Sequence, residues 1–154
     1  MNYRHSFHAG NSADVVKHSL LISLVRALQH KQGALTLIDT HAGCGLYDLY
    51  GDEAQRTGES TQGVLRAFDD PNPLLDDYRA AIREVNVGGE PQLYPGSPRI
   101  LAQLLRPQDL LILNEKHLMN DSDKEMFNAI QLETLSINQY KNLMNTMLLG
   151  GLWH

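Results

Sequence analysis

One stretch of the chain, Leu35–Tyr47, restricts its possible folds most, because an apolar run is followed at once by an acid and a glycine-rich bend. The run Leu35–Ile38 predicts a short buried strand, and Asp39 ends it. Gly43 and Gly45 let the backbone turn with positive φ and approach a ligand closely. A strand, an acid and Gly-x-Gly in this order are typical of α/β domains that bind a nucleotide-like ligand beyond the carboxyl end of the strand.

The spacing of the glycines bears on which ligand this loop suits. A dinucleotide fingerprint needs a third glycine three residues after Gly45, and Asp48 occupies that position. S-adenosylmethionine carries no phosphate, and its ammonium group needs acceptors such as Asp39 or the loop carbonyls. On this stretch alone, a loop that holds S-adenosylmethionine and a strand–turn–helix unit without any ligand are equally supported.

Composition favours one globular domain with a sizeable core. The chain has 154 residues, of which 42% are apolar and 20% are charged. It has no apolar run near the roughly 18 residues of a membrane span, no apolar signal core at its start, and a single cysteine, Cys44, so we expect a cytoplasmic protein. The net charge of −5 gives no overall support for binding nucleic acid, which would need a local basic patch.

A helix is predicted from about Ala13 to about His30, with Ser12 as its N-cap. At about 100° per residue its apolar stripe consists of Leu21, Leu24, Val25 and Leu28. Extended towards the N-terminus, the stripe carries the polar residues Asn11, Asp14, Lys17 and His18. Such groups are costly to bury without partners. We therefore favour a helix end that lines a polar ligand pocket over a solvated first turn with one half-buried histidine.

Further along, helical spacing in 63–68 and 74–87 predicts a small inserted helical subdomain over about residues 52–95. The turn Tyr94–Pro98 then leads into a helix with Ser97 as N-cap. Leu110–Leu113 predicts a second buried strand, which ends at Glu115. An acid in that position often binds ribose hydroxyls, and the insertion explains why it comes so late in the chain. A solvated loop carboxylate is the alternative for Glu115.

Several blocks of the sequence are specific in combination. They are Tyr3–Asn11, Ala13–Val15 with Lys17 and His18, Asp39–Gly45, Arg56–Glu59, Tyr94–Pro98, and Glu115 with His117. Together they resemble the 23S ribosomal RNA adenine-N6 methyltransferase J family over roughly residues 1–117. The resemblance implies an α/β, Rossmann-like S-adenosylmethionine-dependent methyltransferase core formed by residues 1–51 and 96–154. It further implies methylation of adenine N6 at position 2030 of that RNA.

The resemblance also implies site residues. It implies contacts to S-adenosylmethionine at His18, His41, Ser97 and Glu115, beside the loop residues Asp39, Gly43 and Gly45. Contacts to the ribosomal RNA are implied at Tyr3 with its basic neighbours Arg4 and His5, and Lys17 is a weaker candidate. No metal site is expected. These assignments agree with the pocket that the polar helix end and the glycine-rich loop suggest independently.

One departure from the family concerns catalysis. Family members carry an Asp-Pro-Pro-Tyr motif after a later strand, and the 154 residues contain no such motif. Its Asp side chain and a proline carbonyl accept hydrogen bonds from the amino group of a flipped adenine, which positions that nitrogen for methyl transfer. Asp70–Pro73 matches only superficially, so we assign no catalytic residue. The chain looks like the N-terminal half of a family member, truncated at its C-terminal end, and we expect little or no turnover from it alone.

Three hypotheses remain open at this point. The first is an RNA adenine-N6 methyltransferase, and the second is a non-catalytic remnant that binds the cofactor or nucleic acid, since the family is also described in connection with the use of external DNA. The third is another Rossmann-type enzyme such as a dehydrogenase, which the missing third glycine disfavours. Loss of later strands would leave an open edge near Leu110–Leu113 and favour self-association. Two further helices are predicted, from Ser122 to about Ile130 and at Asn138–Leu149.

Overall fold

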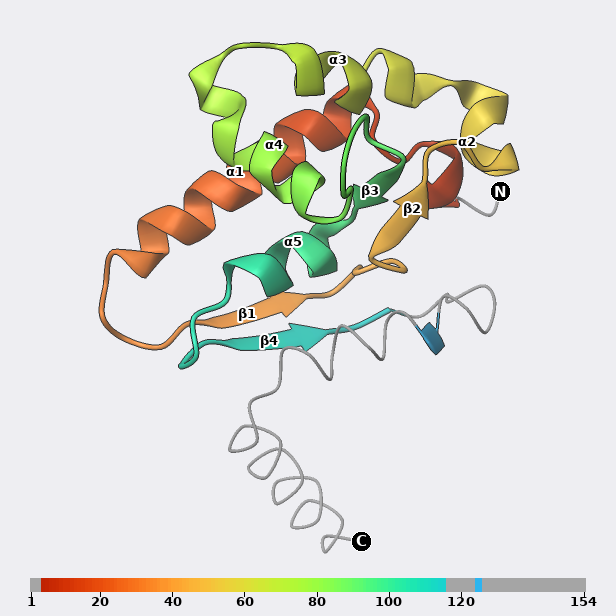
Figure 1. Ribbon diagram of the computed structural model, residues 1–154. Helices are drawn as coiled ribbons and strands as arrows, with labels where there is room; N and C mark the ends of the chain where they lie inside the picture. The colour runs from red at the N-terminus through yellow and green to blue at the C-terminus, as the bar shows by residue number, and fades with distance from the viewer. Residues whose placement is uncertain (1–3, 116–123, 126–154) are drawn as a thin grey trace, which may run out of the picture.

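A computed structural model of the protein describes residues 4–115 and 124–125, and it is a mixed α/β structure (Figure 1). The helices are α1 Ser12–Gln29, α2 Asp52–Thr57, α3 Val64–Asp69, α4 Asp76–Glu84 and α5 Ser97–Leu104. The strands are β1 Thr36–Asp39, β2 Leu46–Asp48, β3 Leu93–Pro95 and β4 Leu110–Leu113. Short 3-10 turns are η1 His5–Phe7, η2 Glu59–Thr61 and η3 Pro73–Leu75. The two predicted strands around the glycine-rich loop are thereby confirmed.

The strands form two separate pairs within the described part of the chain. β1 and β4 run parallel, with Ile38 opposite Ile112, and β2 and β3 run antiparallel, with Tyr47 opposite Tyr94. Because β1 and β4 are parallel, their carboxyl ends lie at the same edge, and the long connection between them must cross over the sheet. That connection contains β2, β3 and α2–α5, so most elements of the fold lie between β1 and β4 in the sequence, although these two strands are neighbours in space.

A polar clamp fixes the amino ends of this parallel pair. Asp109, buried just before β4, accepts a hydrogen bond from the backbone N–H of Leu35 at 2.9 Å. Arg106 donates to both carboxylate oxygens of Asp109 and to the backbone carbonyls of Gln29, Lys31 and Gly33. These hydrogen bonds, chiefly those from Arg106, hold the pKa of Asp109 well below its ordinary value. One ion pair therefore joins the end of α1 to the beginnings of β1 and β4.

Helix α1 is confirmed, but its buried face differs from the predicted stripe. The buried residues are Asp14, His18, Ile22 and Val25, whereas Leu24 is 58% exposed and Leu28 is 38% exposed. Helices α3, α4 and α5 pack against the side that carries His18. The prediction placed the buried face along the leucines. However, α1 carries more apolar residues than these three helices cover. Its buried face instead includes the polar residues Asp14 and His18.

The predicted burial of the strands is correct for one face of β4 and wrong for its other face and for β1. Leu111 and Leu113 are buried, but Ile38 is 64% exposed and Ile112 is 42% exposed. Side chains alternate between the two faces of a strand, and helices α1–α5 lie on only one side of the pair (Figure 1). The face that carries the two isoleucines is therefore half of a sheet without a described helix over it.

The helix caps also differ from the predictions. Asn11, not Ser12, is the N-cap of α1, and its side-chain oxygen accepts a hydrogen bond from the backbone N–H of Asp14 at 2.9 Å. Ser12 is the first helical residue and donates to the carbonyl of Gln62. Gly96 likewise precedes α5, so Ser97 is its first residue and not its cap. In both cases the cap lies one residue earlier, because that residue has the extended backbone that a cap requires.

The region 52–95 is largely helical, and α3 and α4 confirm the two predicted helices within it. Its last strand, β3, pairs with β2, which precedes the region in the chain. The division of the chain into a core and an inserted subdomain stays a prediction. The two helices that we predicted beyond residue 121 lie outside the described residues, apart from Lys124 and Glu125. Within the described part, no helix is both long and apolar enough to cross a membrane.

The start of the chain is fixed against the segment that follows α2. The backbone N–H of Val64 donates to the carbonyl of Gly10 at 2.7 Å, and the hydroxyl of Thr57 donates to the carbonyl of Phe7. At Gly63 the two segments approach so closely that an added Cβ would lie 2.0 Å from the Gly10 carbonyl oxygen. This contact is with backbone atoms, so a rotamer change cannot relieve it.

We therefore expect Gly63→Ala to destabilise the protein by about 2–3 kcal/mol, because the new methyl group must push the two backbones apart. Gly33→Ala is the matched control, since a Cβ there has nothing within 4 Å, and it should be neutral or stabilise by up to about 1 kcal/mol. Urea unfolding followed by circular dichroism measures both. Equal stability of the two variants would contradict the packing described here.

Candidate functional site

The glycine-rich loop that follows β1 is held in a left-handed conformation at two positions. Gly43 has a φ of 66° and Gly45 a φ of 86°. A Cβ on Gly43 would lie 2.3 Å from the hydroxyl oxygen of Tyr47, so glycine is required there for space as well as for its backbone angles. The backbone N–H of Gly96 donates to the carbonyl of Gly45 at 2.9 Å, which seats the loop against the start of α5 and beside Ser97.

Two carboxylates meet at the carboxyl ends of the parallel strands. Glu115, just after β4, accepts a hydrogen bond from the backbone N–H of Gly43 at 2.8 Å. Asp39, the last residue of β1, uses Oδ1 to accept from the backbone N–H of His41 at 3.1 Å. Its other oxygen, Oδ2, is buried and has no hydrogen-bond partner within the part of the chain that the structure describes. Buried polar atoms are nearly always paired in native proteins, so this orphaned acceptor marks a place that suits a cationic donor from a ligand.

His18 lies deeper, at the centre of a buried hydrogen-bonded group. It is 1% exposed, and its Nδ1 shares a hydrogen bond of 2.6 Å with the hydroxyl of Tyr94, which also accepts from Tyr78 at 3.4 Å. Burial disfavours the charged imidazolium and lowers the pKa of His18 to about 4. The imidazole is therefore neutral at physiological pH.

One helical turn before His18, Asp14 gathers the basic side chains of the N-terminal segment. Asp14 is 2% exposed, and its two oxygens accept from Lys17 Nζ at 2.7 Å, from His5 Nε2 at 3.0 Å and from the backbone N–H of Gly10 at 3.0 Å. Burial alone would raise the pKa of Asp14, but the hydrogen bonds from His5 and Lys17 outweigh it and hold this pKa well below its ordinary value.

Tyr47 connects this basic cluster to the glycine-rich loop. Its ring meets the ring of His5 edge to face, with 5.2 Å between centroids and 72° between planes. Its hydroxyl lies beside Gly43, and burial keeps the pKa of that hydroxyl far above its ordinary value. A single buried side chain thus lies between the loop that suits a cofactor and the cations that suit RNA.

The structure brings most of the predicted site residues together, but not all of them. Asp39, Gly43 and Glu115 converge on the loop, Gly45 and Ser97 lie next to each other through Gly96, and His5 and Lys17 meet at Asp14. His41 is exposed, with its ring hydrogen-bonded to the Thr40 hydroxyl. Arg4 turns away and pairs with Glu53 at 3.1 Å. Tyr3 lies outside the described residues.

Sequence reasoning did not predict the contacts that organise these groups. Asp14 stood on the predicted polar stripe, four positions before His18, but its role as the acid that holds His5 and Lys17 was not predicted. Glu59 holds the N-terminal segment by accepting from Asn11 at 3.1 Å and sharing a 2.8 Å hydrogen bond with His8. Glu59 and Tyr94 stood in the family blocks and Tyr47 at the end of the glycine-rich stretch, but their roles depend on long-range packing that no local pattern reveals.

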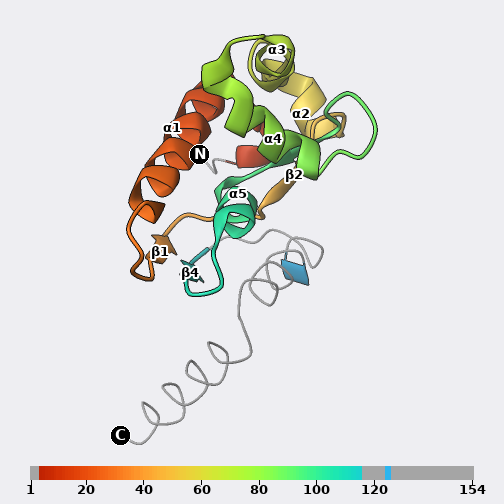
Figure 2. The ribbon, with the colours of Figure 1, turned by 60° about the vertical axis from the view of Figure 1, so that its left-hand side comes forward.

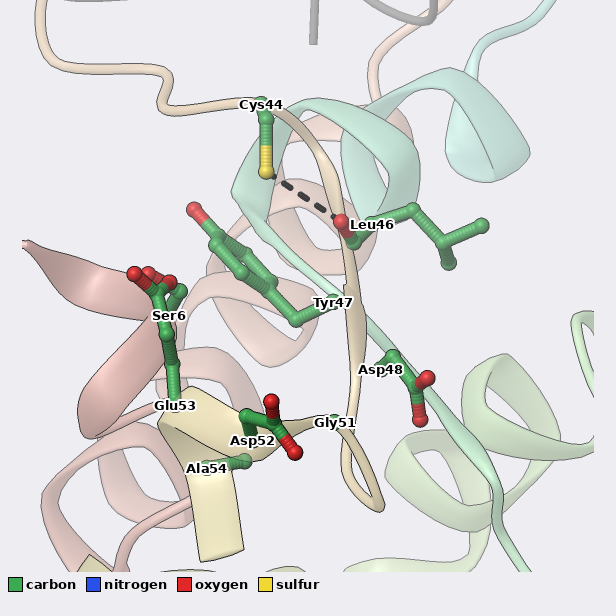
Figure 3. A pocket seen from close by; sticks show the side chains of 9 residues that line it. All are labelled: Ser6, Cys44, Leu46, Tyr47, Asp48, Gly51, Asp52, Glu53 and Ala54. Carbon is green, nitrogen blue, oxygen red and sulfur yellow. Dashed lines mark hydrogen bonds between the residues drawn. The ribbon is translucent and has the colours of Figure 1, made fainter. Parts of the chain in front are cut away.

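A pocket of about 280 Å³ opens on the other side of Tyr47 (Figure 3). Its lining residues are Ser6, Cys44, Leu46, Tyr47, Asp48, Gly51, Asp52, Glu53 and Ala54. Its lining includes neither His18 nor His41, Ser97 or Glu115, and its three carboxylates make it unsuitable for RNA phosphates. We therefore assign it no part in the site. Among the described residues, no three His, Cys, Asp or Glu side chains are grouped so as to hold a metal ion.

Fold and site together define an α/β protein with a glycine-rich loop at the carboxyl end of a parallel strand. A family model described as "Ribosomal RNA large subunit methyltransferase D, RlmJ" matches residues 32–141, and the chain belongs to this family. The resemblance noted in the sequence is thus confirmed.

Similar proteins carry related names. A protein of Escherichia coli K12 named ribosomal RNA large subunit methyltransferase J is 44% identical over 119 residues, which cover 76% of this chain and 42% of that protein. Its namesake from Haemophilus influenzae is 43% identical over 121 residues, 76% of this chain and 43% of the relative. A crystal structure of a Legionella pneumophila DUF519 protein matches with a TM-score of 0.68 and 32% identity, over 79% of this chain and 44% of that one. The chain spans less than half the length of each.

The buried histidine makes the stability of the fold depend on pH in a defined window. The unfolded chain binds a proton at His18 below pH 6.5, whereas the folded chain does so only below about pH 4. Stability should therefore fall as the pH drops through this window, by up to about 1.4 kcal/mol per pH unit and about 2–3 kcal/mol in total. Urea unfolding at a series of pH values measures the slope, which His18→Gln should reduce. An unchanged slope in the variant would contradict the assignment. Asp14 contributes a separate loss of stability, which occurs at lower pH, as the pH falls below the ordinary pKa of an aspartate, 3.8.

Proposed function

We propose that this chain carries the S-adenosylmethionine-binding and RNA-contacting part of a 23S ribosomal RNA adenine-N6 methyltransferase with a Rossmann-like core. The observation that supports this most is the buried, unpartnered oxygen of Asp39 at the end of β1, beside the left-handed glycines and the carboxylate of Glu115. We also propose a cytoplasmic location for this chain, because the similar proteins are named as methyltransferases of ribosomal RNA.

The donor set at the loop fits S-adenosylmethionine better than it fits a phosphate-bearing cofactor. Asp39 would accept from the ammonium group, and the carboxylate of Glu115, which lies at the loop through its contact with Gly43, is of the type that accepts from ribose hydroxyls. Two carboxylates at the loop would repel a pyrophosphate, which counts against a dehydrogenase. His41 and Ser97 would add contacts at the rim, and neutral His18 would form the inner wall. When bound, the cofactor supplies a methyl group on a positively charged sulfur.

The RNA-contacting surface would be the basic N-terminal cluster. Asp14 fixes His5 and Lys17 in place, and the Lys17 side chain remains 58% exposed, so its other N–H groups are open to a phosphate. Tyr3 and Arg4 would extend this surface. Because the net charge of the chain is −5, such a local cluster is the part of the molecule that suits a polyanion.

Methyl transfer itself needs groups that hold the adenine amino group, and the Asp-Pro-Pro-Tyr motif that does this in the family is absent from these 154 residues. We therefore propose binding of the cofactor with little or no turnover for this polypeptide alone. The same absence favours the second candidate, a non-catalytic binding remnant. Turnover with 23S ribosomal RNA distinguishes the two candidate functions. Only the methyltransferase candidate, and not the binding remnant, gains activity when the missing groups are supplied.

Calorimetric titration with S-adenosylmethionine tests the cofactor assignment. We expect saturable one-to-one binding, and Asp39→Asn should weaken it by roughly 10- to 150-fold, which corresponds to about 1.5–3 kcal/mol for a hydrogen bond to a charged group. Asp48→Asn is the control, because Asp48 is exposed and lines the pocket on the far side of Tyr47. If the folded wild-type chain shows no heat of binding, or if both variants bind equally well, the assignment fails.

Fluorescence anisotropy with a labelled 23S RNA stem–loop tests the basic cluster. Replacing Lys17 by Ala should weaken binding and reduce the slope of log affinity against log salt by about 0.7, the value for one lost phosphate contact on a single strand. Lys31→Ala, at the far end of α1, should leave both quantities unchanged. A Lys17 variant with the wild-type salt slope would remove this residue from the interface.

A further inference from the structure

The side chain of Tyr47 touches the glycine-rich loop, the start of α5 and the N-terminal segment at once. Tyr47 is the middle residue of β2 and is 7% exposed. Its backbone is paired with that of Tyr94 in β3, so the point from which the side chain projects is fixed. A side chain this buried offers almost no surface to a cofactor or an RNA. Any part that it plays in binding must therefore act through the residues that it contacts.

Two of these contacts lie on the cofactor side. A Cβ on Gly43 would lie 2.3 Å from the Tyr47 hydroxyl oxygen, and a Cβ on Gly96 would lie 3.1 Å from its ring carbon Cε2. Gly43 donates its backbone N–H to Glu115 at 2.8 Å. Gly96 directly precedes Ser97, the first residue of α5. The ring therefore packs against the backbone next to both of these proposed cofactor residues.

The third contact lies on the RNA side. In both ribbon views the described start of the chain lies beside β2 (Figure 1 and Figure 2). There the His5 ring meets the Tyr47 ring edge to face, and His5 Nε2 pairs with Asp14 at 3.0 Å. Both contacts orient the imidazole, because the carboxylate fixes one nitrogen and the aromatic ring limits the tilt of its plane. A shift of the Tyr47 ring would therefore reorient a residue that we propose to contact RNA.

The surroundings of Tyr47 leave its ring some room to shift. The pocket of about 280 Å³ borders this side chain, and its ring runs along the pocket with the hydroxyl towards Cys44 (Figure 3). A side chain enclosed by close-packed atoms keeps one position, whereas one that borders a cavity has space for another. The position of the ring therefore depends on how firmly the glycine-rich loop and the start of α5 are held against it.

We propose that Tyr47 is a positioning residue that couples the two binding sites, so that a bound cofactor raises the affinity of the chain for RNA. A cofactor that holds the loop and the start of α5 also holds the Tyr47 ring, and the ring then holds His5 in one orientation. RNA binding has less ordering left to do, which produces positive coupling without a large change of structure. The inference rests on the proposed function, since both ligands must bind this chain.

Two titrations measure the coupling. Fluorescence anisotropy gives the affinity for the labelled RNA stem–loop with and without saturating cofactor, and calorimetry gives the cofactor affinity with and without RNA. The probe is S-adenosylhomocysteine, because it lacks the positive charge on sulfur that would by itself attract RNA. We expect each ligand to raise the affinity for the other by the same factor, at least about fivefold, since coupling between binding equilibria is reciprocal.

Variants at two tyrosines separate coupling from support of the fold. Tyr47→Leu removes the ring and should reduce the coupling factor to about one. Tyr47→Phe keeps the ring beside His5 and Gly96 and should retain most of the factor. Tyr50→Leu is the matched control, since Tyr50 is 53% exposed and lies just beyond β2. A residue that only supported the fold would lower both affinities and leave the factor unchanged.

The outcomes distinguish this inference from the proposed function. A folded Tyr47→Leu variant that keeps the wild-type factor would overturn the inference, and so would a Tyr47→Phe variant that loses as much of it. If the wild-type chain binds both ligands independently, the inference fails and the proposed function stands. If the folded wild-type chain does not bind S-adenosylhomocysteine at all, both fail.

Proton magnetic resonance of the histidines adds a measurement that does not depend on the folding of a Tyr47 variant. The ring centroids of His5 and Tyr47 are 5.2 Å apart, so the tyrosine ring current acts on the imidazole protons. We expect the His5 signals, assigned by their loss in His5→Gln, to shift when S-adenosylhomocysteine is added without RNA. The signals of His30, which is exposed at the other end of α1, should stay in place. Unshifted His5 signals in a chain saturated with the cofactor would contradict the coupling.

Discussion

The parallel pairing of β1 with β4 is the constraint on which the rest of the structure depends. Two parallel neighbours cannot be joined by a tight turn, so the chain must leave β1, build its other elements and return. The Arg106–Asp109 ion pair fixes the amino ends of the two strands, and the contact between Glu115 and Gly43 fixes their carboxyl ends. The glycine-rich loop has its conformation because it lies between these strand ends and the start of α5.

The buried charge of Asp14 organises the part of the site that the N-terminal segment and the start of α1 form. A carboxylate in the interior is tolerated only if hydrogen bonds replace the water that it loses, and Asp14 obtains them from His5, Lys17 and Gly10. These partners all belong to the start of the chain, so the need to satisfy one acid determines where the N-terminal segment lies. The segment is held from its other side by Glu59 and by the close approach of Gly63 to Gly10.

How far the sequence predicted this structure depends on whether a feature is local. The strands β1 and β4, the long first helix and the turn before α5 follow from short-range patterns, and each is confirmed in type. The buried face of α1 was misplaced, because the leucine pattern says which side is apolar but not which side has neighbours. The Asp14 cluster and the edge-to-face contact of His5 with Tyr47 join residues that are far apart or differ little from others of their type, and only packing reveals them. The cap at Asn11 was missed by one residue, since Asn and Ser are both good caps and only backbone angles decide between them.

The family blocks acquire physical meaning once the fold is known. Arg56–Glu59, which as a sequence motif had no evident chemistry, supplies the acid and the hydroxyl that hold the N-terminal segment. The turn Tyr94–Pro98 provides both the hydroxyl that binds His18 and the glycine that contacts the glycine-rich loop. Residues that recur together in the family pattern are therefore connected through this part of the structure by direct contacts.

The hydrogen bond between His18 and Tyr94 has a consequence for synthesis of the protein, because its partners are 76 positions apart. A ribosome that adds about 5–20 residues per second makes Tyr94 roughly 4–15 seconds after His18. Throughout that interval α1 carries an acid and an imidazole on the face that will become its most buried one, with no interior yet formed to receive them. These two side chains exchange water for protein partners only when Tyr94 and the helices around it are in place, so the inner face of α1 is completed late in synthesis.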